Sequence, residues 1–138
     1  MPSLNATLQQ LLPIRRQRLR RAESQLREAT QSLAQQEAEL GLLRQEKETQ
    51  QVYYRQQQQD FRQRQQEQAL SLDSLQQQRE RTQRQIGRLR QQQQQCEHGE
   101  ALCQQQRQQV TDKRARLRQR QKAVEKLEFI LTLNQEPS

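Results

Sequence analysis

The chain has 138 residues, 30% of them hydrophobic and 3% aromatic, with no Trp and a net charge of +8 at pH 7. Burial of so few apolar side chains cannot offset a backbone entropy cost of roughly 1–2 kcal/mol per residue in a compact globular core. The composition therefore excludes a globular domain with a large core. It leaves a disordered chain, or an elongated helical assembly that buries only a narrow stripe.

The residue types favour helix along the whole chain. Gln accounts for 36 residues and forms helices well, whereas Gly and Pro number only three each. No apolar run approaches the roughly 20 residues of a membrane-spanning helix. The N-terminal stretch also lacks the charged segment and apolar core of a signal peptide. We therefore expect a cytoplasmic chain without direct membrane insertion, with both cysteines reduced.

The first predicted helix covers about residues 13–68. Its main part is expected to start at Pro13, after a short helical or frayed stretch SLNATLQQLL, because proline suits the first turn of a helix. Leu recurs at every seventh position near its start, at Leu12, Leu19, Leu26, Leu33 and Leu40. This spacing predicts a left-handed coiled coil. A second buried position is expected three residues after each Leu, where Ala22 and Ala29 stand.

The predicted turn covers about residues 69–74. Ser71, Asp73 and Ser74 are residue types that end helices or cap the next one. Gly99, in the sequence CEHGEAL, offers a rival turn. A turn there would leave most of the first helix without a partner, so the earlier position is favoured.

The second predicted helix covers about residues 75–134 and continues the same spacing to Leu131. Of the 18 positions seven apart from Leu12 to Leu131, 15 are apolar if Cys and Tyr are included. We call these 18 positions the core series. In this helix the second buried position is predicted three residues before each core-series residue, where Leu72 and Ile86 stand.

This change of side predicts that the chain folds back on itself, because antiparallel coiled coils pair unlike heptad positions. Leu19 would then face Val124, and Leu40 would face Cys103. The constant spacing also allows registers that are shifted by half a heptad. The sequence thus predicts an all-α fold: one long antiparallel two-helix coiled-coil hairpin that takes in residues 1–138 as a single domain.

Cys96, His98 and Cys103 lie close together and have three interpretations: seam packing, a metal site or a redox sensor. Both cysteines belong to the core series, where Cys behaves as a small apolar side chain. On a helix they would be about 10.5 Å apart, too far for a disulfide. Seam packing is favoured. The sequence contains no phosphate-binding loop, nucleophile elbow or zinc-protease motif. We expect no catalytic residues, cofactor or metal, and no enzyme activity.

Two basic segments, RRQRLRR at 15–21 and DKRARLRQRQKAVEK at 112–126, would meet at the open end of the hairpin. They are either a solvated face or a surface for an acidic partner. The aromatic groups that single-strand nucleic-acid binders use for stacking are absent from both, so an acidic protein socket fits better and no nucleic acid is expected. The basic residues counted there are Arg15, Arg16, Arg18, Arg20, Arg21, Arg27, Lys113, Arg114, Arg116, Arg118, Arg120, Lys122 and Lys126.

The apolar segment LEFILTL at 127–133 lies at the same end. It either packs against Leu4, Leu8 and Leu11 or contacts a partner. The candidate partner-binding residues are therefore Arg15, Arg16, Arg20, Arg118, Lys122, Leu127, Phe129 and Ile130.

Three stretches, LLPIRRQRLRRAESQLREA, VYYRQQQQDF and KAVEKLEFIL, together with the overall layout, resemble the type III secretion central-stalk family. This family includes FliJ-like and YscO-like coiled-coil proteins. The resemblance covers nearly the whole chain. It implies an antiparallel coiled coil whose open end enters the pore of a hexameric secretion ATPase. The opposite tip, at about residues 63–79, would point to the cytoplasmic ring of the membrane export gate.

The resemblance also implies contacts with secretion chaperones and a place at the base of a membrane secretion apparatus. Two other functions remain open from the residues alone. One is a generic coiled-coil scaffold or parallel homodimeric rod. The other is a basic coiled coil that binds nucleic acid.

Overall fold

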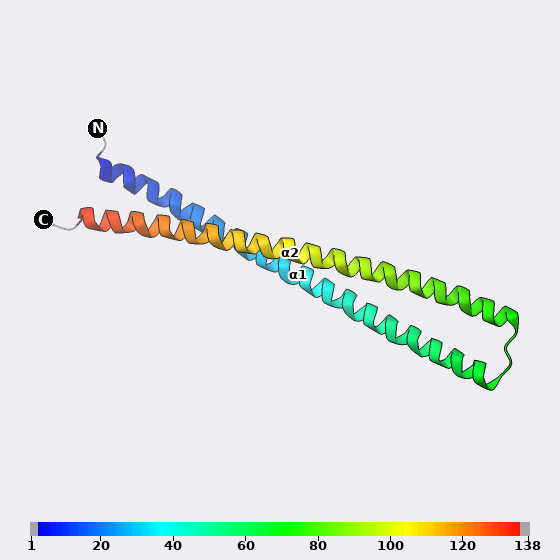
Figure 1. The fold of residues 1–138 in the computed structure, drawn as a ribbon. Coiled ribbons are helices and arrows are strands. Elements are labelled where there is room, and N and C mark those ends of the chain that lie inside the picture. Colours follow the sequence, from blue (N-terminus) through cyan, green and yellow to red (C-terminus); the bar gives the residue numbers. More distant parts are fainter. Residues whose placement is uncertain (1–2, 136–138) are drawn as a thin grey trace. The chain divides into compact units, whose positions relative to one another are not determined.

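The computed structural model describes residues 3–135, which form two long helices and no strand. Helix α1 (Leu4–Glu67) and helix α2 (Leu72–Gln135) are joined by residues 68–71 (Figure 1). The helices pack against each other, so the predicted all-α, antiparallel two-helix fold is confirmed. The chain divides into two units. The first unit is formed by Met1–Gln35 and Gln104–Ser138, and the second by Gln36–Cys103.

Helix α1 begins at Leu4 and not at the predicted residue 13, because Ser3 caps it. The Ala6 N–H donates to Ser3 Oγ over 3.1 Å, and the Thr7 N–H donates to the Ser3 carbonyl over 3.2 Å. The first bond satisfies an amide group that the first turn of a helix otherwise leaves without a partner, and the second is the first regular bond of the helix. Pro13 lies inside the helix at an exposed position, where water can reach the carbonyl that proline leaves unbonded.

The connection in the second unit takes in residues 68–71, whereas residues 69–74 were predicted. Ser71 caps α2, since its hydroxyl accepts the Ser74 N–H over 3.2 Å. Asp73 follows in the first turn, where a negative charge favours the helix dipole. The turn therefore ends three residues earlier than expected. The rival turn at Gly99 is wrong, because Gly99 lies within α2.

Most of the core series is buried or half-buried in both units, whereas Gln68 and Leu75, next to the turn, are exposed. In the first unit its buried members are Val110, Val124 and Leu131, and the Leu residues from Leu12 to Leu33 are half-buried. In the second unit Leu40, Tyr54, Cys96 and Cys103 are buried, and both thiols are free. The predicted packing of both cysteines in the seam is thus confirmed. His98 is exposed.

The second buried position is correct for α1 and wrong for α2. In α1, Ala22 and Ala29 are buried as predicted. In α2, the predicted residues Leu72 and Ile86 are 79% and 44% exposed. In α2 the second row of buried or half-buried positions lies three residues after the core series: Gln78, Gln85, Gln92, Gly99, Gln106, Lys113, Arg120 and Leu127. Both helices therefore use the same heptad frame.

The register differs from the predicted one by four residues. A Cβ atom on Gly99 would lie 3.1 Å from Leu40 Cδ1, so Leu40 packs on Gly99, four residues before the predicted Cys103. This is one of the half-heptad shifts that the constant spacing allowed. The predicted register would have paired apolar with apolar residues in some layers and polar with polar residues in the layers between. The observed register places one core-series residue in every layer, opposite a small or polar residue in most layers and opposite a Leu in the others, such as Leu127 and Leu43.

Gln85 shows how a polar side chain in the seam lowers the stability of the fold. It is only 5% exposed. Its side-chain amide donates to Gln57 Oε1 over 2.6 Å, but its own carbonyl oxygen has no hydrogen-bond partner among the described residues. The side-chain oxygens of Gln92 and Gln106 are also buried without a hydrogen-bond partner among the described residues. An unsatisfied buried acceptor costs about 1–3 kcal/mol.

We predict that Gln85→Leu raises the free energy of unfolding by about 1–2 kcal/mol, because it removes the unsatisfied oxygen and adds apolar area. The half-buried Gln57 can bond to water instead. Thermal and urea unfolding followed by circular dichroism would measure this. Gln94→Leu, at an exposed position of the same helix, is the matched control and should change little. Destabilisation by Gln85→Leu would show that the glutamine bond supports the seam.

Candidate partner-binding surface

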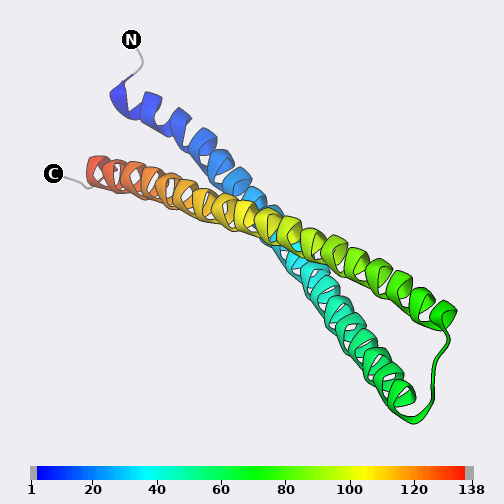
Figure 2. The ribbon, with the colours of Figure 1, turned by 45° about the vertical axis from the view of Figure 1, so that its right-hand side comes forward.

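In the first unit, the two basic segments lie side by side although they are far apart in the sequence. The Arg15 guanidinium donates from Nη1 to the Ala123 carbonyl over 3.0 Å. Arg16 Nη2 forms an ion pair with Glu128 Oε1 at 3.1 Å. Both views show the blue N-terminal part of α1 beside the red C-terminal part of α2 (Figure 1 and Figure 2). The fold therefore brings these segments into one surface.

The predicted binding residues do not all reach this surface. Arg16, Arg20, Arg118 and Lys122 are exposed, and Phe129 is 64% exposed. Arg15 and Ile130 are half-buried. Leu127 is 1% exposed and packs in the seam. Arg15 and Leu127 thus hold the two helices together, while the others remain available for contacts.

The cations of the first unit lie on two different flanks of the seam. On one flank Arg16 pairs with Glu128, and Glu23 lies seven residues after Arg16 on the same side of α1. Side chains seven apart on a helix share one face. This flank, which we call the mixed flank, therefore carries charges of both signs.

The opposite flank contains two adjoining hollows between the helices. One, of about 350 Å³, is lined by Arg15, Arg18, Arg120, Ala123 and Lys126. The other, of about 260 Å³, is lined by Arg18, Arg21, Ala22, Gln25, Arg116 and Arg120. We call the surface that they share the basic groove. No carboxylate lines either hollow in the part of the chain that the structure describes.

Sequence reasoning counted these arginines but did not select them, apart from Arg15, as binding residues. The available signal was their position: Arg18 and Arg116 each stand directly before a core-series residue. That position flanks the seam, but only the register decides which residues meet across it.

Exposed apolar side chains continue the surface toward the helix ends. Leu4 is 74% exposed, Leu11 is 36% exposed and Leu133 is 52% exposed. Leu8 is half-buried and Leu131 is buried. The apolar C-terminal segment therefore divides its residues between the seam and the solvent.

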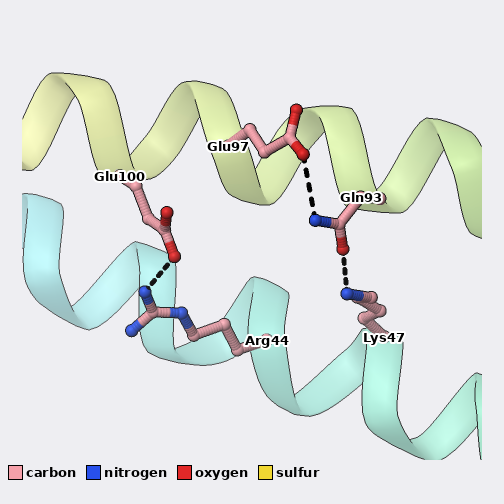
Figure 3. A network of polar contacts seen from close by, with 5 residues as sticks. All are labelled: Arg44, Lys47, Gln93, Glu97 and Glu100. Atoms are coloured by element: carbon pink, nitrogen blue, oxygen red, sulfur yellow. Dashed lines mark hydrogen bonds and ion pairs between the residues drawn. The ribbon is translucent and has the colours of Figure 1, made fainter.

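A polar network in the second unit has a structural explanation (Figure 3). Arg44 forms an ion pair with Glu100, and Lys47 donates to the Gln93 carbonyl oxygen. The Gln93 amide in turn donates to Glu97 over 3.0 Å. Lys47 is a core-series residue, and this chain of bonds satisfies its ammonium group beside the seam. Exposed ion pairs such as Arg44–Glu100 stabilise by about 1 kcal/mol at most.

Comparisons with family models, curated proteins and solved structures found no match for this chain. Among residues 3–135 there is no group of three or more His, Cys, Asp or Glu side chains that could hold a metal ion. Neither helix, over the residues described, has an apolar stretch long enough to cross a membrane. The assignment of function therefore rests on the chain's own geometry and charge.

We predict that Cys96→Ala combined with Cys103→Ala keeps the helical circular dichroism spectrum and lowers the free energy of unfolding by about 1–3 kcal/mol. The reason is that two small cavities replace two buried sulfurs. Urea unfolding would measure the loss. Complete loss of folding, or a loss of partner binding with folding unchanged, would show that the thiols do more than fill the seam.

Proposed function

We propose that this chain is a non-enzymatic central stalk of a type III secretion export apparatus. Its open end inserts into the pore of the hexameric ATPase, and its turn faces the export gate. The observation that supports this most strongly is the first unit, where the basic segments at 15–21 and 112–126 form one surface fastened by the Arg16–Glu128 pair.

Charge gives the docking a physical basis. The exposed cations Arg16, Arg20, Arg118 and Lys122 would meet acidic groups on the pore lining. Phe129 and Ile130 would add apolar contact beside them. Arg15 and Leu127 act indirectly, because they join α1 to α2 at the level of these residues.

The second unit would contact the export gate. Its turn at residues 68–71 would face the cytoplasmic ring of the export gate. Secretion chaperones are further proposed partners. The place of action would be the cytoplasmic base of the membrane apparatus.

Two alternatives are less well supported. A parallel homodimeric rod is at odds with two helices of one chain packed against each other. A nucleic-acid-binding coiled coil would need several stacking groups near the cations, but of the four aromatic residues only Phe129 belongs to the first unit. A generic scaffold shares the fold but predicts no effect on an ATPase.

The test measures ATP hydrolysis by the export ATPase of the organism that encodes this chain. Wild-type protein should bind the hexamer and stimulate hydrolysis. Reversal of all four charges, by Arg16→Glu, Arg20→Glu, Arg118→Glu and Lys122→Glu, should weaken binding strongly. Each contact contributes about 0.5–1 kcal/mol at a wet interface, and reversal adds repulsion.

A control with the same change of charge separates docking from net charge. Arg55, Arg62, Arg79 and Arg90 are exposed in the second unit, and their replacement by Glu should leave stimulation intact. Circular dichroism would verify that both variants fold. A folded four-fold reversal at the open end that stimulates as well as wild type would eliminate docking through these cations. Absence of any binding by wild type would eliminate the stalk function.

A further inference from the structure

We propose that the basic groove is a docking site for an amphipathic helix of a partner protein. This helix is acidic where it lies along Arg18, Arg21 and Arg116, and apolar where it reaches Leu11 and Ile130. The inference does not depend on the ATPase, because apart from Arg15 and Ile130 the docking site uses residues that the ATPase proposal leaves unassigned.

Residues from both helices line the groove. Arg18 and Arg120 line both hollows, so the two form one continuous surface. The half-buried Arg120 comes from the seam itself. Because Arg15 is tied to the Ala123 carbonyl, its charge is held at the floor of the groove. A ligand therefore meets cations at the floor and on both sides.

The cations of the groove lack internal counter-charges. Within residues 3–135, no ion pair involves Arg18, Arg21, Arg116, Arg120 or Lys126. On the mixed flank, by contrast, Arg16 is paired with Glu128. Crowded like charges repel one another, and an acidic ligand would relieve that repulsion. The groove thus selects a ligand with several negative charges in a row.

The apolar continuation identifies the ligand as a protein helix. Leu11 lies seven residues before Arg18, and Ile130 lies seven residues after Ala123, so each extends the same flank toward the open end. A phosphate backbone has no apolar groups that could pack against these side chains. A third helix laid along two packed helices presents one stripe to them, as in helix-in-groove recognition.

A second copy of this chain is a poor occupant. It carries a net charge of +8 and would bring cations to cations. Nucleic acid is also disfavoured, because neither hollow is lined by an aromatic side chain on which a base could stack. An acidic amphipathic helix satisfies both the charge of the groove and its apolar end.

The experiment uses the full chain and a fluorescein-labelled synthetic helical peptide of about six turns. Its groove-facing positions are Glu in one half and Leu in the other. Fluorescence anisotropy should show saturable binding with one peptide per chain, weaker at high salt. Arg18→Gln with Arg116→Gln should weaken binding by about tenfold. Arg27→Gln with Arg114→Gln removes equal charge from exposed positions outside the groove and should change affinity by less than about twofold.

Further arms separate the remaining explanations. Leu11→Ser with Ile130→Ser should weaken peptide binding but not the binding of a single-stranded DNA oligonucleotide of equal charge. Equal weakening by the two arginine pairs would reduce the effect to net charge and overturn the proposal. A DNA oligonucleotide that binds more tightly than the peptide and loses affinity through the same Arg18 and Arg116 changes would assign the groove to nucleic acid instead. No saturable peptide binding at low salt would also overturn the proposal.

Discussion

The structure depends on a seam in which most layers bury one core-series residue against a small or polar neighbour. Leu40 packs on Gly99, and two heptads further along each helix the same register sets Tyr54 opposite Gln85. Such layers remove little apolar area from water, so each stabilises weakly. The aliphatic stems of Lys and Arg add to the burial while their charged ends reach the solvent. This accounts for the half-buried Arg15 and Arg120 in positions that most coiled coils fill with Leu.

The same constraint shapes the surface. Arginine side chains within the seam place positive charges at the floor of the space between the helices. These charges add to the positive charges of the residues that flank the seam. On the mixed flank, Glu128 neutralises Arg16. On the other flank, Arg18, Arg116 and Arg120 meet without a carboxylate among the residues that line the hollows. The weakness of the seam and the charge of the groove thus have one origin. A partner that binds the groove would stabilise the hairpin by mass action, because it favours the folded state.

Sequence reasoning reached the fold because the core series repeats strictly and Ser71 is a recognisable cap. It missed the second buried position of α2 because Gln85, Gln92 and Gly99 carry no hydrophobic signal, whereas the exposed Leu72 and Ile86 do. The register could not be fixed either, since a constant heptad repeat matches several half-heptad shifts equally well. The sequence identified the individual basic residues, but it could not identify the groove. It exists only where the register brings Arg18 and Arg116 to the same hollow.

The register is therefore the claim that most needs a direct measurement. Leu40 packs on Gly99. Because the helices are antiparallel, the layer three residues later in α1 is three residues earlier in α2. Leu43 therefore lies opposite Cys96. The four-residue shift would place Lys47 opposite Cys96 instead. In a Cys103→Ala background, Leu43→Cys and Lys47→Cys would each be oxidised gently at low protein concentration, and intramolecular disulfide formation would be followed by mass and gel mobility. The observed register predicts faster cross-linking for Leu43→Cys, because disulfides require Cα atoms within about 7 Å. Faster cross-linking of Lys47→Cys would contradict both the register and the groove that depends on it.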